Sequence, residues 1–183
     1  MLASSAVHPD RERWNAKYRA GVHHPICVNL IMHLGRLTKG RAIDVAGGIG
    51  ENAAMLAQAG FRVTLADISD EGVIAAKRHS RELRADFDVV QADAARLPFR
   101  AAFDTVVCTY FLDRSVDLAS LLRPGGTLFV ESFTVGTLKY TPDFRRAFCL
   151  EEGELRRLFP LEEVLYKEDD DGSRVTATLI ARR

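Results

Sequence analysis

The stretch Ala42-Ile43-Asp44-Val45-Ala46-Gly47-Gly48-Ile49-Gly50-Glu51-Asn52-Ala53 decides the fold of this chain. Four apolar residues around a single carboxylate predict a buried strand, and helix formers follow the glycines as far as Ala59. Glycine lets a ligand approach the backbone closely, and the free N–H groups at a helix start favour an anion. A strand, a glycine turn and a helix in this order therefore indicate a nucleotide site.

The composition limits the classes of protein to which the chain can belong. Its 183 residues suit one domain with a single substantial core, and no apolar run approaches the roughly 20 residues of a membrane span. The 25 basic and 25 acidic residues cancel, so no overall field attracts nucleic acid or an anionic membrane. Cys27, Cys108 and Cys149 form no C-x-x-C pair, and the N-terminus lacks the pattern of an export signal. We therefore expect a cytoplasmic protein without nucleic acid, membrane or metal as partners.

Hydrophobic periodicity and turn residues divide the chain into alternating elements. We predict strands over residues 42–46, 61–66, 87–90, 103–110, 127–133, 161–166 and 174–181. We predict helices over residues 9–20, 25–34, 52–59, 69–79, 113–122 and 151–159, with an irregular stretch over 134–148. Gly35 and Gly60 stand where the C-terminal caps of two of these helices would lie.

Strands that alternate with helices indicate a doubly wound α/β fold, in which helices cover both faces of a mostly parallel sheet. The turn signal Asp169-Asp170-Asp171-Gly172 lies between the last two strands and predicts an antiparallel hairpin at or near one edge. We expect one domain over residues 1–183, with a helical cap over 1–36 and a seven-stranded core over 41–183. A ligand should lie at the carboxyl ends of the strands, where the strand order reverses, although the order itself stays open.

Three aspartates stand in or directly after predicted strands. Asp44 lies inside an apolar strand, where an unpaired carboxylate is costly, so it either bonds the neighbouring turn or contacts a cationic ligand group. Asp67 follows Gly50 by 17 residues, a spacing at which an acidic residue accepts hydrogen bonds from ribose hydroxyls. We expect its carboxylate to face a cleft with few protein partners. Asp93 either accepts from an adenine amino group or caps a helix.

This pattern resembles the class I S-adenosylmethionine-dependent methyltransferases over nearly the whole chain, from Asp44 to Ala181. Further family signatures are Leu97-Pro98-Phe99, Phe103-Asp104 and Leu122-Arg123-Pro124-Gly125-Gly126-Thr127-Leu128. The resemblance implies a Rossmann-like fold and S-adenosylmethionine as cofactor, with methionine at the glycine loop, ribose at Asp67 and adenine at Asp93. The cofactor-binding residues that we then expect are Asp44, Ala46, Gly47, Gly48, Gly50, Asn52, Asp67, Ile68, Asp93, Ala94 and Thr109.

Within that family the chain looks most like the tellurite-resistance and thiopurine-type small-molecule methyltransferases. The short length, the pair Trp14 and Tyr18, and the segments Glu131-Ser132-Phe133 and Leu150-Glu151-Glu152-Gly153-Glu154-Leu155 carry this finer likeness. Two departures matter. Ala46 replaces the first glycine of the family's G-x-G-x-G, and Cys108-Thr109-Tyr110-Phe111 replaces the Asn/Asp-Pro-Pro-Tyr motif. The second departure argues against adenine or amide nitrogen as the methyl acceptor.

Methyl transfer from a sulfonium asks little of the protein beyond in-line alignment and exclusion of water. A base is needed only if the acceptor arrives protonated, and the acceptor atom (S, Se/Te, N or O) stays open. The catalytic candidates are Tyr110, His23 and His24, with a packing aromatic and a surface histidine pair as the alternatives. The candidates for binding a small-molecule acceptor are Trp14, Tyr18, Tyr110, Arg145 and Arg146, of which the arginines are otherwise solvated charges. We expect a monomer or a homodimer.

The charged segment 9–20 has only a narrow apolar face around Trp14 and Tyr18, which share one helix face. With Gly21 as a hinge, it is predicted to close over the bound cofactor. The alternative is a helix permanently docked on the sheet.

Two other functions fit part of the pattern. Gly48 to Ala53 also satisfies G-x-G-x-x-A, the fingerprint of an NAD(P)-dependent oxidoreductase. Asp44, Asp93 and the lack of a Tyr-x-x-x-Lys pair argue against that class. A non-catalytic S-adenosylmethionine-binding protein is the second alternative, because catalysis here is mostly geometry.

Overall fold

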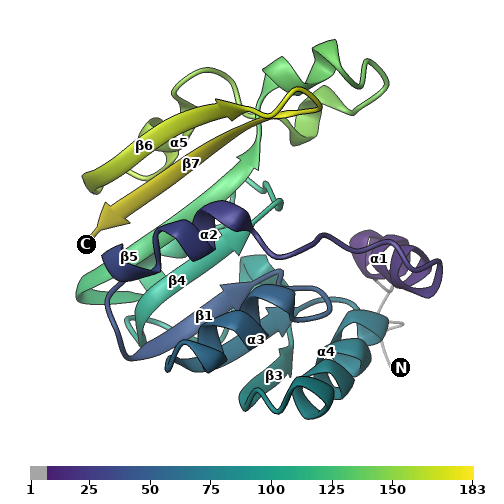
Figure 1. The fold of residues 1–183 in the computed structure, drawn as a ribbon, viewed down its shortest axis with the longest axis vertical. Helices are drawn as coiled ribbons and strands as arrows, with labels where there is room; N and C mark the ends of the chain where they lie inside the picture. Colours follow the sequence, from purple (N-terminus) through teal and green to yellow (C-terminus); the bar gives the residue numbers. More distant parts are fainter. Residues whose placement is uncertain (1–7) are drawn as a thin grey trace, which may run out of the picture.

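A computed structural model describes residues 8–183 of the protein. One sheet runs through the molecule with strand order β3-β2-β1-β4-β5-β7-β6 (Figure 1). The first five strands are parallel, and β7 runs antiparallel to both of its neighbours. The strands are β1 (Arg41–Val45), β2 (Arg62–Asp67), β3 (Phe87–Gln91), β4 (Phe103–Thr109), β5 (Leu122–Phe133), β6 (Glu162–Asp170) and β7 (Val175–Arg182). This confirms the expected fold class and the antiparallel C-terminal hairpin.

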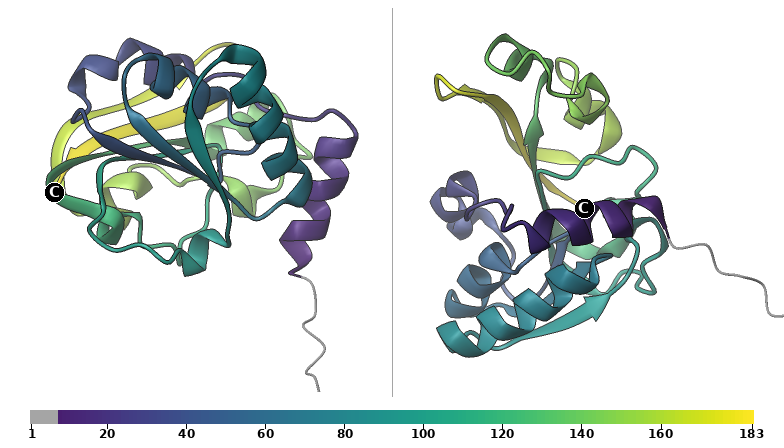
Figure 2. Two further views of the ribbon diagram at one scale, coloured as in Figure 1. Left: turned by 90° about the horizontal axis from the view of Figure 1, so that it is seen from below. Right: turned by 90° about the vertical axis from the view of Figure 1, so that its right-hand side faces the viewer.

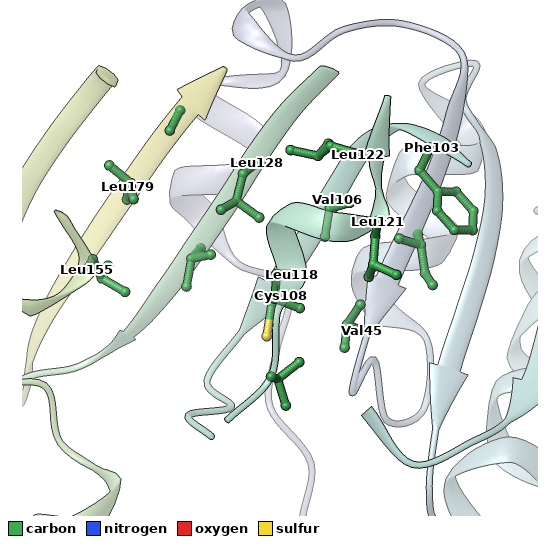
Figure 3. Close-up of a cluster of buried hydrophobic side chains, with 14 of the residues drawn as sticks. Val45, Phe103, Val106, Cys108, Leu118, Leu121, Leu122, Leu128, Leu155 and Leu179 are labelled. Atoms are coloured by element: carbon green, nitrogen blue, oxygen red, sulfur yellow. The ribbon is translucent and has the colours of Figure 1, made fainter. Parts of the chain in front are cut away.

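The two faces of the sheet are covered differently (Figure 2). One face packs against α2 (Val28–Met32), α3 (Glu51–Gln58) and α4 (Asp70–Leu83), with Leu30, Leu56 and Phe87 in its core. The other face is covered by a 3-10 helix, Leu118–Leu121, and by the short α5 (Glu154–Leu158). Leu118, Leu121 and Leu155 lie there over Val106 and Leu128 of the sheet (Figure 3). Helices therefore pack on both faces of the same sheet, and the pairing of its parallel strands sets where their carboxyl ends lie.

Two predicted helices, over residues 113–122 and 151–159, are shorter in the structure. Residues 113–122 form only the 3-10 helix, because Asp113 accepts two hydrogen bonds from Ser115 in a local turn. The helix begins only after Asp117, whose side chain caps it by accepting from the Ser120 N–H. The segment predicted over 151–159 begins as a helix only at Glu154, after Gly153 in the left-handed conformation.

Other boundaries also differ: β6 runs to Asp170, four residues past its predicted end, and so includes two residues of the predicted turn. The predicted helix 25–34 is α2 followed by a 3-10 turn, Leu34–Arg36, so Gly35 lies inside that turn and is not a cap. Gly60, with φ of 86°, does follow the end of α3 as expected. Strand β5 begins at Leu122, five residues before the predicted start.

The strand order reverses between β1 and β4, whose crossovers lead to opposite sides of the sheet. This reversal opens a crevice at the carboxyl ends of these strands. The helix α1 (Pro9–Arg19) lies beyond those ends, beside the start of α4 (Figure 1). Among residues 8–183 no helix has the length and apolar character needed to cross a membrane.

Candidate active site

The glycine loop between β1 and α3 is built for close approach. A Cβ at Gly47 would lie 2.7 Å from an Asp44 carboxylate oxygen, and Gly48 and Gly50 have φ of 58° and 88°. These positions therefore need glycine. Ala46 also has a positive φ, 56°, which an alanine adopts at a cost of about 1 kcal/mol or more. The replacement of the family's first glycine thus places strain in the loop.

Asp44 is fully buried below this loop, and neither carboxylate oxygen has a hydrogen-bond partner within residues 8–183. Burial, with a contribution from the nearby charge of Asp67, raises the pKa of Asp44 to about 7. Of the two alternatives for Asp44, a hydrogen bond to the neighbouring turn is therefore not observed. An unpaired carboxyl in this place is suited to a cationic ligand group.

Asp67 corrects one expectation. Its side chain is 5% exposed and accepts two backbone hydrogen bonds, from the Gly48 N–H at 2.9 Å and the Ser69 N–H at 2.8 Å. It therefore ties the glycine loop to the start of α4, and it is not a carboxylate with few partners. Burial raises its pKa, and these two bonds lower it in part.

Asp93 serves as a cap and still faces the crevice. Its Oδ1 accepts from the Ala95 N–H at 2.9 Å, at the start of a 3-10 helix over residues 94–96. The crevice between α1 and the strand ends is lined by Ile68, Ala94, Thr109 and both Asp67 and Asp93, among others. Asn52 donates to Thr109 Oγ1 and accepts from the Cys27 N–H, both at 2.9 Å. Its amide thus fastens the segment before α2 to the end of β4.

Helix α1 covers the crevice and is held by polar contacts. Asn15 is buried and bonds Ser69 and Asp70, while Arg11 forms a two-bond ion pair with Asp70. Trp14 and Tyr18 stack with ring centroids 5.6 Å apart on the side of the crevice. The Tyr18 hydroxyl lies so close to the loop that a Cβ at Gly48 would be 2.6 Å from it. The structure thus shows the helix in a closed position; its movement stays a prediction.

Tyr110 sits in the left-handed conformation directly after β4, with φ of 56°. Its hydroxyl donates to Glu131 Oε1 at 2.9 Å, and its ring lies 5.3 Å from that of Phe133. Glu131 is 2% exposed and also accepts from Asn29 and Thr178, each at 2.7 Å. Burial and the Glu131 charge raise the pKa of Tyr110, so its phenol keeps its proton and is a poor candidate for a base.

His24 lies where two hollows meet. Its ring centroid is 5.1 Å from that of Tyr110, and it lines both the crevice and a second hollow beside it. Burial lowers the pKa of His24, as do the charges of Lys17 and Arg174. The lowered pKa favours the neutral imidazole, which is the form that can accept a proton. His23 lies beside the glycine loop and does not line the second hollow.

We call this second hollow the aromatic pocket. Its walls are the rings of Trp14, His24, Tyr110, Phe133, Phe144 and Phe148, with Arg13 and Lys17 of α1 at its side. The pocket opens into the crevice, since Trp14, His24 and Tyr110 line both. The arrangement can hold a planar molecule against the end of a ligand bound along the strand ends.

A family model described as a methyltransferase domain matches residues 42–126, which include the glycine loop, Asp44, Asp67 and Asp93. This match, the curated methyltransferase relatives and the solved methyltransferase structures together support an S-adenosylmethionine-dependent methyltransferase. Its cofactor is S-adenosylmethionine, and the comparisons support neither the oxidoreductase nor the non-catalytic alternative.

Curated relatives of the methyltransferase include the ubiquinone biosynthesis O-methyltransferase of Xanthomonas campestris pv. campestris (strain B100). It is 29% identical over 165 residues, which are 85% of this chain and 67% of the relative. The demethylmenaquinone methyltransferase of Beutenbergia cavernae is 36% identical over 110 residues, or 55% of this chain and 44% of that protein. The chain thus spans two thirds or less of the length of these relatives.

The fold of the methyltransferase also matches solved structures. Magnesium protoporphyrin IX methyltransferase from Synechocystis PCC 6803 with bound S-adenosylhomocysteine superposes with a TM-score of 0.74 at 20% identity, over 95% of this chain and 97% of that one. At this identity the likeness concerns the fold alone.

The structure of the methyltransferase brings together most of the residues predicted for the site, with two exceptions. Arg146 pairs with Glu151 on the surface, and Arg145 lies 4.9 Å from the centroid of the Phe148 ring without lining the aromatic pocket. The prediction missed Phe133, Phe144 and Phe148, which lie in or next to a stretch without periodicity. It also missed Arg13 and Lys17, although each directly precedes a predicted site aromatic.

Proposed function

We propose that this methyltransferase transfers the methyl group of S-adenosylmethionine to a hydroxyl oxygen of a small aromatic acceptor. One observation carries the proposal: an aromatic pocket adjoins the crevice at His24, whose side chain lines both. The printed name of one relative, an O-methyltransferase of ubiquinone biosynthesis, supports oxygen as the acceptor atom.

The described residues fit the cofactor, with the orphaned Asp44 carboxyl as the test of that fit. In our proposal Asp44 and the glycine loop bind the charged methionine end, and Asp67 accepts from the ribose hydroxyls. Ile68, Asp93 and Ala94 then lie at the adenine. When bound, S-adenosylmethionine supplies a methyl group that its sulfonium has already activated.

The protein's own residues then have three tasks. His24 accepts the hydroxyl proton of the acceptor on an imidazole nitrogen, as a general base. Trp14, Phe133 and Phe148 enclose the acceptor ring and keep water away from the reacting atoms. Tyr110, fixed by Glu131, supplies a wall of the pocket and keeps its own proton.

Sulfur, selenium or tellurium acceptors, as in the tellurite-resistance and thiopurine-type enzymes, are the second candidate. The likeness of Glu131-Ser132-Phe133 to those enzymes favours this candidate. Such acceptors react as anions and need no base. The two candidates therefore differ in their dependence on His24.

The test compares catechol and 4-nitrothiophenol as acceptors, with product formation followed by mass spectrometry. In the His24→Gln variant, methylation of catechol should fall by about 100-fold or more, while methylation of the thiol stays within about twofold. The His23→Gln variant is the matched control and should lose neither activity. Methylation of the thiol alone by the wild-type protein would overturn oxygen as the acceptor. An equal loss of both activities in His24→Gln would overturn the role of His24.

A further inference from the structure

Helix α1 carries four cationic side chains, two on the side of α4 and two on the side of the aromatic pocket. On the side of α4, Arg11 pairs with Asp70 and Arg19 with Glu71, so each has a carboxylate from another element. On the other side, Arg13 and Lys17 line the aromatic pocket one helical turn apart. The Arg13 guanidinium carbon lies 5.1 Å from the Phe148 centroid, and the Lys17 ammonium lies 4.3 Å from the Trp14 centroid.

Arg13 and Lys17, the two cations that line the pocket, have no carboxylate partner from another element in the part of the chain that the structure describes. Within residues 8–183, Lys17 has no carboxylate within 4.0 Å, and Arg13 has only Asp10 of its own helix, at 3.0 Å. The Arg13 Nε is buried without a hydrogen-bond partner in the same part of the chain. Two like charges one turn apart on a helix repel each other. In agreement, burial and the charge of Arg13 lower the pKa of Lys17.

The other charged groups around the pocket are already engaged. Arg114 forms a two-bond ion pair with Glu154 and donates to two backbone carbonyls. Asp113 accepts twice from Ser115 through Oδ1, and Arg174, beside Tyr110, pairs with Asp171. The donors that remain for a ligand are therefore Lys17 and the Arg13 N–H groups outside its ion pair with Asp10, a residue that also lines the pocket.

We propose that Arg13 and Lys17 form an anion-binding subsite of the aromatic pocket, so that the acceptor is an aromatic acid, a planar ring that carries a carboxylate as well as its hydroxyl. This inference rests on the proposed function, because it names the class of acceptor for the same pocket. A guanidinium binds a carboxylate through charge-assisted hydrogen bonds, and the neighbouring rings hold the aromatic plane. The carboxylate also removes the repulsion between the two cations.

The test uses two probes of the same shape, 3,4-dihydroxybenzoate and its neutral counterpart 3,4-dihydroxybenzamide. Each is titrated by calorimetry into the full chain saturated with S-adenosylhomocysteine. We expect the acid to bind at least 10-fold more tightly than the amide at low salt. The variants Arg13→Gln and Lys17→Gln should each weaken binding of the acid by about 5- to 20-fold and change binding of the amide by less than twofold.

Lys77→Gln, which removes an exposed cation from α4, is the matched control and should change neither affinity. Retained S-adenosylhomocysteine affinity shows that each variant is folded. Equal affinities of acid and amide in the wild-type protein would overturn the anion subsite. So would the absence of binding of both probes, or an equal loss of both in the variants.

The outcome is separable from that of the proposed function. If the acid binds preferentially but receives no methyl group from S-adenosylmethionine, the subsite stands and O-methyl transfer to such acceptors fails. If acid and amide are methylated equally well, transfer stands and the subsite fails.

Discussion

The two hollows of this methyltransferase are lined by different kinds of chemical group. The crevice at the strand ends relies on backbone groups and buried carboxylates, with Gly48, Asp44 and Asp67 fixed by the register of parallel β1 and β2. The aromatic pocket relies on rings and cations from α1 and from segments after β4 and β5. The first is fixed by the sheet, and the second by how irregular segments pack on it. We therefore expect changes at residues that line the pocket alone, such as Phe144 and Phe148, to alter acceptor binding without disturbing the cofactor, whereas changes in the crevice affect both the cofactor and the fold.

The largest expected effect is that of buried Asp44 on the pH dependence of the free energy of unfolding. If Asp44 titrated like a surface carboxylate, the contrast between the two hollows would fail. Its pKa is about 7 in the folded protein and near its ordinary value, 3.8, in the unfolded chain. Between these pH values the folded state holds the extra proton, so the free energy of unfolding falls as pH rises from about 4 to 7. The total fall is roughly 4 kcal/mol at most.

Urea denaturation of the ligand-free protein and of the Asp44→Asn variant at several pH values measures this effect. The wild-type protein should lose stability relative to the variant across that range. A constant difference between the two proteins from pH 4.5 to 8 would contradict the unpaired, buried state of Asp44.

Replacement of Asp67 sharpens the comparison, because this residue joins ligand binding to folding. Asp67→Ala removes the acceptor of the Gly48 and Ser69 N–H groups as well as the proposed ribose partner. We expect the affinity for S-adenosylhomocysteine to fall by about 10- to 100-fold and the free energy of unfolding to fall by about 2 kcal/mol. Calorimetry and thermal unfolding measure the two effects. Asp88→Ala, at an exposed position of β3, is the control and should change neither.

Glu131 tests the other hollow. Glu131→Gln keeps the shape of the side chain but replaces the charged acceptor of the Tyr110 hydroxyl, so the wall of the pocket loosens. We expect kcat/KM for the acceptor to fall by about 10-fold, while the affinity for S-adenosylhomocysteine stays within twofold. Steady-state kinetics with calorimetry separates the two quantities. A comparable loss of cofactor affinity would show that the two hollows are not independent.

Ala46 gives the smallest expected effect. Because its φ is 56°, Ala46→Gly should relieve strain and raise the free energy of unfolding by about 0.5–1 kcal/mol. Thermal unfolding of the ligand-free protein measures the change. As a control, Ala57→Gly in α3, a helical position, should lower stability by a similar amount. Destabilisation by Ala46→Gly would mean that the alanine methyl contributes more through packing than its backbone costs.

The same division explains what the sequence could predict. The crevice was predictable because a strand, a glycine turn and a helix are local patterns, and parallel strands bring Asp44, Asp67 and Asp93 to one edge. The partners of Asp67 were not, because the Gly48 and Ser69 N–H groups reach it only through the tertiary turn.

The aromatic pocket was only half predictable. Tyr110 and His24 stood out by type and place, but Phe144 and Phe148 come from a stretch with no period to read. The sequence left Arg145 and Arg146 open between binding an anionic acceptor and standing as solvated charges. Whether an arginine is engaged depends on its partner, and the Glu151 that binds Arg146 is found only in the folded chain.

The contacts of α1 have a kinetic consequence. This helix rests on α4 through polar contacts of Arg11, Asn15 and Arg19, and the Tyr18 ring adds one apolar contact at Gly72. In the proposed function the spent cofactor lies beneath Tyr18, so its release would require these bonds to break and would coincide with the opening of α1. Ion pairs weaken as ionic strength rises, while apolar packing does not. Turnover limited by release would therefore speed up in salt, in the same range in which binding of a charged acceptor becomes weaker. The two trends oppose each other, and the salt concentration of fastest turnover marks the point where they balance.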